Sequence, residues 1–182
     1  MRSLRVILLV SVSLLFSGCP ARSIHPLFTD KEAVFDASLI GTWTSNEESY
    51  TFEKLQEKNY RLVVRSQNEN DSAVYAVLLG KIGSAWFLDS YPIVNSNEHH
   101  FLSVHVFTRM TMQGDSLTLA TLEADWLLKM ITEKKITIDH AQRENEIILT
   151  ASTNKLQHFV NSIRGNNEAF PNPNVFIRTK RQ

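Results

Sequence analysis

Apolar and polar side chains alternate in several short runs after residue 39, and this alternation is the feature that most constrains the fold. Residues 50–53 read Tyr-Thr-Phe-Glu and residues 60–65 read Tyr-Arg-Leu-Val-Val-Arg, with a polar turn at 56–59 between them. A period of two is typical of antiparallel strands that have one wet and one buried face. We therefore expect a chain that is mainly β.

The strand pattern continues to the end of the chain, with two interruptions. Further strands are expected at 72–80, 84–91, 101–112, 116–122, 136–140, 146–151 and 175–178. Gly114 supplies the positive φ that a tight hairpin at 113–115 needs. Two short helices are predicted in the C-terminal half: Asp125 caps 126–132, and a second helix begins near Ser152 or Thr153 and ends at Gly165.

The first 18 residues have the features of a bacterial secretory signal. Arg2 and Arg5 form a basic start, and an apolar run follows at 6–16. These eleven residues are well short of the roughly 20 that a helix needs to cross a bilayer. We therefore expect residues 1–18 to be a cleaved signal peptide.

Cys19, the one cysteine of the chain, follows Phe16-Ser17-Gly18. This order resembles the lipobox of bacterial lipoproteins, although that family usually has Leu where Phe16 stands. The resemblance implies that Cys19 becomes the N-terminus and carries acyl chains such as palmitate, because its thiolate is the suitable nucleophile. Pro20, rather than Asp, implies the outer membrane, facing the periplasm. The alternative is an ordinary signal peptide that leaves a free thiol.

The composition favours one globular domain. The chain has 182 residues, of which 43% are hydrophobic and 21% are charged, with 19 basic and 19 acidic side chains. Because these charges balance, the chain has no net electrostatic field that would attract a nucleic-acid partner. Residues 19–38 are expected to form a tether that ends by packing Leu27, Phe28, Val34 and Phe35 on the domain, and residues 39–182 to form that single domain.

Gly41-Thr42-Trp43, at the start of the first expected strand of the domain, resembles the Gly-x-Trp signature of lipocalins and other calycins. The resemblance implies an antiparallel barrel that Trp43 closes at one end. It also implies a late arginine against the face of the indole, where a guanidinium makes a cation-π contact and hydrogen bonds. Arg178 is the first candidate for this arginine, and Arg181 is the second.

A second resemblance covers more of the chain. It is to a group of uncharacterised bacterial lipoproteins, and it rests on the blocks Pro26-Leu27-Phe28-Thr29, Val34-Phe35-Asp36, Leu39-Ile40-Gly41-Thr42-Trp43, Thr51-Phe52-Glu53-Lys54 and Ala124-Asp125-Trp126-Leu127. The helix near Asp125 and the number of late elements depart from a simple eight-strand meander. The expected fold is therefore a mainly β, antiparallel lipocalin-like barrel or half-barrel with two short helices in the C-terminal half.

Catalytic and metal sites receive little support from the sequence. On one strand His99 and His105 would lie about 20 Å apart at about 3.3 Å per residue, while His100 faces the other way. Among three carboxylates, Asp89 and Glu123 are expected to be solvated, and Asp125 is expected to cap a helix. We therefore expect no metal, no cofactor and no catalytic residues, and the chain is not expected to be an enzyme.

Aromatic side chains at alternating strand positions suggest either a filled barrel or a ligand pocket. The candidates are Tyr50, Phe52, Tyr60, Trp86, Phe101 and Phe107. Two functions follow. One is a membrane-tethered binding module for a small apolar or amphipathic molecule such as a lipid or fatty acid, and the other is a structural or protein-interaction scaffold with a packed interior. A cavity would favour the first function.

Overall fold

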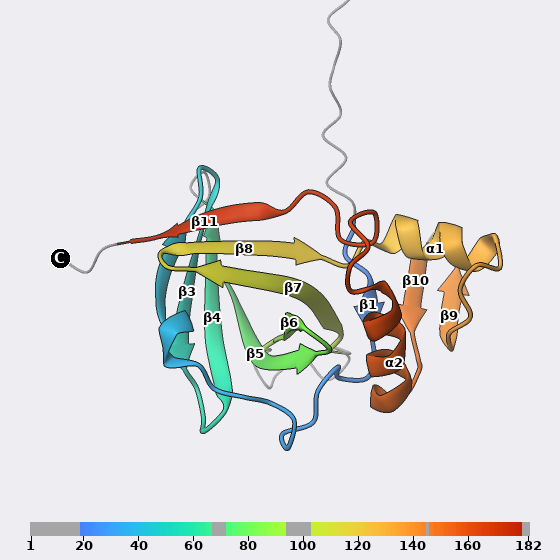
Figure 1. Ribbon diagram of the computed structural model, residues 1–182, viewed down its shortest axis with the longest axis horizontal. Coiled ribbons are helices and arrows are strands. Elements are labelled where there is room, and N and C mark those ends of the chain that lie inside the picture. Colours follow the sequence, from blue (N-terminus) through green and yellow to red (C-terminus); the bar gives the residue numbers. More distant parts are fainter. Residues whose placement is uncertain (1–18, 67–71, 94–102, 145, 180–182) are drawn as a thin grey trace, which may run out of the picture.

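The computed structural model describes residues 19–66, 72–93, 103–144 and 146–179 (Figure 1). Its strands are β1 (Arg22–Ser23), β2 (Gly41–Thr44), β3 (Glu48–Lys54), β4 (Asn59–Ser66), β5 (Ser72–Ile82), β6 (Ala85–Pro92), β7 (His105–Gln113), β8 (Ser116–Thr121), β9 (His140–Arg143), β10 (Glu146–Leu149) and β11 (Asn174–Arg178). Its helices are the 3-10 turn η1 (Ala37–Leu39), α1 (Ala124–Thr132) and α2 (Thr153–Ile163). The chain is mainly β, as the alternation predicted.

Eight strands form a closed antiparallel barrel, so the prediction of a lipocalin-like barrel is confirmed and the half-barrel is excluded. From β2 to β8, each strand lies beside the next one along the chain. β11 lies between β8 and β2. The barrel closes because β6 also pairs with β7, with Leu88 opposite Thr108. Every strand of the barrel therefore has two hydrogen-bonded neighbours and no edge is left open.

The late elements lie outside the barrel. Between β8 and β11 the chain forms α1, β9, β10 and α2 (Figure 1). β9 pairs antiparallel with β10, β10 pairs parallel with β1, and β1 pairs with β7. The extra elements therefore extend the sheet beside the barrel and leave the eight-strand closure intact.

Leu27 and Phe28 pack on the domain as predicted, but the described residues before them are part of the sheet and do not form a free tether. β1 is a strand of the sheet, and Ala21, Leu27, Phe28 and Ala33 are buried. The backbone amide of Val34 donates to the carbonyl of Leu79 at 2.8 Å. The segment from Cys19 to η1 is thus a strap along the outside of the barrel, because Leu27, Phe28 and Ala33 are buried against the wall, although Val34 is exposed.

Three boundaries also differ from prediction. β9 starts at His140 where 136–140 was expected, and α1 begins at Ala124 with Glu123, not Asp125, at its N-cap. The helix starts early because the amide of Ala124 donates to the Cys19 carbonyl and that of Glu123 to the Ala169 carbonyl. At the end of α2, Arg164 is the C-cap and Gly165 does not adopt a positive φ.

Two hydrophobic cores lie on opposite sides of the barrel wall. The inner core fills one half of the barrel with Leu39, Trp43, Phe52, Tyr60, Val77, Leu79, Met110, Leu117 and others. The outer core packs the strap, α1, β10 and α2 on the outside of β5 to β8, with Leu27, Phe28, Phe87, Phe107, Leu127, Leu156 and Val160 among its members. Parts of the wall are consequently buried on both faces.

Candidate ligand-binding site

Trp43 closes one end of the barrel. Its side chain is fully buried, and its indole Nε1 donates to the carbonyl of Leu39 at 2.9 Å. The guanidinium carbon of Arg178 lies 4.0 Å from the ring centroid, a cation-π distance. The same guanidinium donates to the carbonyls of Ile40, at 2.9 Å, and Ser38. The arginine thus ties the last barrel strand to the turn before β2.

Gly41 is required at this end of the barrel. Its φ of 131° is a conformation that L residues rarely adopt, and a Cβ there would lie 3.0 Å from Nη1 of Arg178. The structure therefore brings together Gly41, Trp43 and Arg178, the three residues singled out by the Gly-x-Trp resemblance. Arg181 lies outside the described residues.

Three of the predicted pocket aromatics fill the closed half of the barrel. Phe52 and Tyr60 are buried with their rings edge to face, 6.3 Å apart. The Tyr60 hydroxyl accepts from the Asp36 amide at 2.6 Å and donates to the Asp36 carbonyl at 3.1 Å. Trp86 packs against the same core, with Lys81 Nζ 5.6 Å from its ring. These rings are core residues and do not line a cavity.

The prediction for Phe107 is wrong in a different way. Phe107 belongs to the outer core, whereas its neighbours Val106 and Thr108 line the inside of the barrel. Apart from Phe107, its face of β7 carries His105, Arg109, Thr111 and Gln113. The alternation of the whole strand therefore points Val106, Thr108 and Met110 inward, and choosing single aromatic residues missed this. Phe101 lies outside the described residues.

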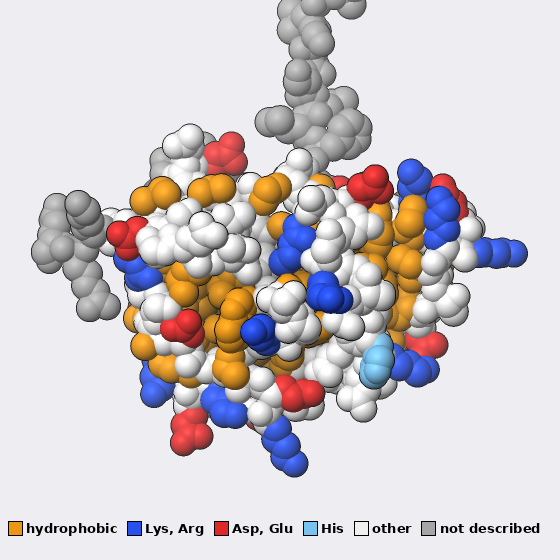
Figure 2. Space-filling model, viewed as in Figure 1, with side chains coloured by type: hydrophobic (Ala, Val, Ile, Leu, Met, Phe, Trp, Pro, Cys, Tyr) orange, Lys and Arg blue, Asp and Glu red, His pale blue; other side chains and the backbone are white. Residues whose placement is uncertain are grey.

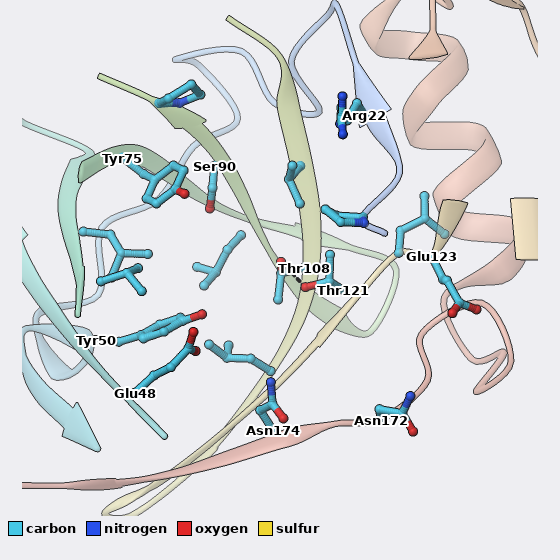
Figure 3. A pocket seen from close by; sticks show the side chains of 18 of the residues that line it. Arg22, Glu48, Tyr50, Tyr75, Ser90, Thr108, Thr121, Glu123, Asn172 and Asn174 are labelled. Atoms are coloured by element: carbon cyan, nitrogen blue, oxygen red, sulfur yellow. Dashed lines mark hydrogen bonds between the residues drawn. The ribbon is translucent and has the colours of Figure 1, made fainter. Parts of the chain in front are cut away.

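The other half of the barrel holds a cavity of about 620 Å³ (Figure 3). Of the predicted aromatics within the described ranges, Tyr50 alone lines it. Its described lining comprises Pro20, Arg22, Glu48, Tyr50, Leu62, Val64, Tyr75, Leu88, Ser90, Pro92, Val104, Val106, Thr108, Leu119, Thr121, Leu122, Glu123, Pro171, Asn172, Asn174 and Phe176. Sequence reasoning missed the others because most are small aliphatic or hydroxyl side chains, although Glu48, two residues before Tyr50, shares its face of β3.

Apolar side chains form the boundary between the packed half and the cavity. Leu62, Leu88, Leu119 and Phe176 belong both to the inner core and to the cavity lining. The ring of Phe176 lies against that of Tyr50, with centroids 4.5 Å apart. The inner end of the cavity is therefore apolar.

Hydroxyl groups line the walls of the cavity outside its apolar inner end. Thr108 and Thr121 are hydrogen-bonded to each other at 3.0 Å across β7 and β8. Figure 3 shows Tyr75 beside Ser90, with both side chains lining the cavity. An amphipathic molecule would thus meet apolar contacts at depth and uncharged hydrogen-bonding groups along the wall.

Tyr50 and Glu48 form the most polar pair on the wall. Their side chains point toward one another in Figure 3. Burial raises the pKa of Tyr50, and the charge of Glu48 and a side-chain hydrogen bond to it raise it further. Tyr50 therefore keeps its proton in the folded chain.

The described rim of the cavity carries the other ionisable groups, Arg22 and Glu123. Burial raises the pKa of Glu123, and the neighbouring Asp125 raises it further. Asn172, from the loop that leads into β11, and Asn174, the first residue of β11, lie on the same rim. Glu48, the first residue of β3, also lies at this end of the cavity. With Glu48 counted, the rim has two acidic side chains and one basic side chain among its described residues.

Asp89 is a structural group outside the cavity, and the expectation that it is solvated is wrong. Its side chain is fully buried and accepts from the Leu27 amide at 2.7 Å and from His105 Nδ1 at 2.8 Å. The ring of His105 also lies 5.0 Å from that of Tyr91. A buried carboxylate needs such partners, and here they fasten the strap to the wall.

The described residues contain no group of three or more His, Cys, Asp or Glu side chains that could hold a metal ion. His99 and His100 lie outside the described residues. Within the described ranges, neither helix is long and apolar enough to cross a bilayer. Comparisons with protein-family models, with curated proteins and with solved structures found no significant match.

Proposed function

We propose that this protein is a lipid-anchored lipoprotein of the bacterial cell envelope, placed in the outer membrane and facing the periplasm, whose barrel binds a small apolar or amphipathic molecule. The observation that carries the binding role is the cavity of about 620 Å³ in one half of the barrel. Pockets for small molecules typically measure about 300–1,000 Å³ and combine apolar walls with a few polar groups.

The lining supports an amphipathic ligand in particular. The leucines and Phe176 at the inner end match an alkyl chain or ring, and burying such a group contributes about 25 cal/mol per Å² of apolar area. Tyr75, Ser90 and the Glu48–Tyr50 pair supply hydrogen-bonding groups for a polar head. Lipids and fatty acids of the envelope are the ligands that we would test first.

The scaffold is the second candidate function, and one feature of the surface favours it. Val175 and Ile177 are 52% and 54% exposed on the outer face of β11. Figure 2 shows hydrophobic side chains along the upper edge of the molecule, where Figure 1 places β11. Such side chains suit contact with a protein partner. The hollow half of the barrel is the reason that we place ligand binding first.

Native mass spectrometry of residues 20–182, purified without detergent, tests the binding role. We expect a co-purifying molecule that organic extraction removes. Titration of the extracted protein with fatty acids and phospholipids should then restore the added mass and quench tryptophan fluorescence, because Trp43 and Trp86 lie in the barrel.

A matched pair of double variants tests whether the ligand binds in the cavity. Val64→Phe/Val106→Phe fills the cavity and should lower affinity at least tenfold, whereas Val34→Phe/Val175→Phe adds the same volume on the exposed surface and should not. A ligand-free protein that ignores the whole panel would overturn the binding role in favour of the scaffold.

The anchor has its own test. Cys19 is exposed, so its sulfur is accessible for acylation. Several acyl chains hold a protein firmly at about 0.8 kcal/mol per buried methylene, whereas one chain holds it weakly. Cys19→Ser should therefore move the protein from the carbonate-washed membrane to the soluble fraction. A variant that remains in the membrane fraction would contradict the lipid anchor.

A further inference from the structure

The first described residues of the chain form part of the cavity rim. The Cys19 carbonyl accepts from the Ala124 amide at 2.9 Å, and the Ala21 amide donates to the Leu122 carbonyl at 2.8 Å. Between them, Pro20 is bridged to Glu123 in the manner of paired strands. Pro20, Arg22 and Glu123 all line the cavity. The residue proposed to carry the lipid is therefore the direct neighbour of a rim residue.

No flexible linker separates Cys19 from the barrel. Arg22 and Ser23 pair with β7 on one side and β10 on the other, and Ala21 is buried. Adjacent Cα atoms lie only about 3.8 Å apart. A flexible linker would let the barrel turn freely beneath its anchor, whereas this junction fixes which part of the barrel lies nearest the acyl chains.

The rim and the surface beside it can contact lipid. Pro92 and Pro171 line the mouth, and the next exposed apolar side chains are Ile93, 44% exposed, and Val175. Among the described rim residues Glu48 and Glu123 outnumber Arg22. Attraction to an anionic leaflet would therefore not orient the domain, and the position of the anchor would have to do so.

We propose that the acylated Cys19 holds the open mouth of the barrel against the bilayer, so that the cavity exchanges its ligand directly with the membrane leaflet. This inference rests on the proposed lipidation and adds the orientation and the source of the ligand. The partner surface is the lipid bilayer itself. A ligand would then pass from leaflet to cavity without crossing water.

Fluorescence quenching by brominated phospholipids tests the orientation on the full lipidated chain in phosphatidylcholine vesicles. Glu47→Cys, beside rim residue Glu48, and Gln56→Cys, in the turn beyond β3, place a fluorophore at opposite ends of the same strand. The two sites lie about 30 Å apart at about 3.3 Å per residue. We expect the label at position 47 to be quenched at least threefold more than the label at position 56.

The matched control is the same label pair in a chain with 15 Gly and Ser residues inserted between Cys19 and Pro20. Such a linker spans about 20 Å on average and frees the barrel to rotate, so the difference between the labels should collapse. Equal quenching in the original chain, or stronger quenching at position 56, would overturn the orientation.

Mass spectrometry of the same samples separates this inference from the proposed function. A chain without acyl mass would overturn the anchor and the orientation together. An acylated chain with equal quenching would overturn the orientation and leave the anchor and the cavity in place.

Discussion

The two halves of the barrel share the same eight strands but differ in what fills them. At the closed end the inward side chains include Trp43, Phe52 and Tyr60, and the interior is solid. At the open end they include Val64 and Thr108, with other small side chains, and the interior is hollow. An eight-stranded barrel is just wide enough for side chains to fill it. The closed half thus packs large rings against one another, whereas the open half places Tyr50, Tyr75 and Phe176 among valine, serine and threonine side chains that leave space between them.

The halves also differ in how their polar groups are satisfied. Trp43, Tyr60 and Arg178 all bond to backbone carbonyls of the segment 36–40, so the closed end is held in one arrangement. Polar groups of the open half, such as Glu48 and Asn174, face the cavity. We therefore expect stability to depend on the closed half and ligand binding on the open half.

The largest expected effect is the loss of the indole at the closed end. Trp43→Ala should lower the free energy of unfolding by about 3–5 kcal/mol, because it empties a fully buried site. Tyr50→Ala, its counterpart in the open half, should lower it by about 1–2 kcal/mol, because that ring already borders empty space. Chemical denaturation measures both, and equal losses would contradict the comparison.

Larger side chains should likewise destabilise the protein more in the closed half than in the open half. Val77→Phe overpacks the closed half, where Val77 is fully buried, and should destabilise the protein by about 1–3 kcal/mol. In Val106→Phe the new ring points into the cavity, so the free energy of unfolding should change by less than about 1 kcal/mol. Urea midpoints of the two variants at matched m-values give the test. A large loss for Val106→Phe would indicate that the open half has no room.

The smallest expected effect is a pH dependence that originates in the open half. The pKa of Tyr50 is raised in the folded chain, so its stabilising contribution is complete below its unfolded pKa of about 10 and declines as pH rises above that value. Tyr50→Phe should reduce the loss of stability between pH 10 and 11 by up to about 1.4 kcal/mol. Denaturation curves across this range measure the change.

Tyr60→Phe provides the control from the closed half. Burial also raises the pKa of Tyr60, but its protonated hydroxyl already bonds to the Asp36 backbone at neutral pH. This variant should therefore be less stable near neutral pH as well as less sensitive above pH 10. A Tyr50→Phe curve parallel to that of the unmodified chain would refute a buried, neutral Tyr50.

The binding site was harder to predict than the fold, and Phe107 and Val106 show why. They are neighbours on β7, so their side chains lie on opposite faces of the strand. Yet the strap, α1 and α2 cover the outside of the wall with apolar side chains, so the larger residue lies in the outer core and the smaller one lines the cavity. Apart from Tyr50, the described aromatic residues that were predicted to line a pocket therefore belong to the two cores.

The strap shows a related difficulty. Residues 20–38 have no period and two prolines, which are features of a linker. Their attachment depends on partners far along the chain: Asp89 for the Leu27 amide, and Thr153, whose hydroxyl donates to the Pro26 carbonyl at 2.8 Å. Contacts over such separations leave no local signal in the segment itself.

The sequence by itself determined the β class, the hairpins of the barrel and the two helices, because these depend on local periodicity and turn chemistry. Gly41 and Trp43 were singled out by the Gly-x-Trp resemblance and not by local periodicity. Only the tertiary structure decided that β11 closes the barrel beside β2, that Cys19 lies at the rim and that one half is hollow. These features depend on non-local pairing and on the volumes of side chains from eight strands, and such quantities are set only when the strands meet.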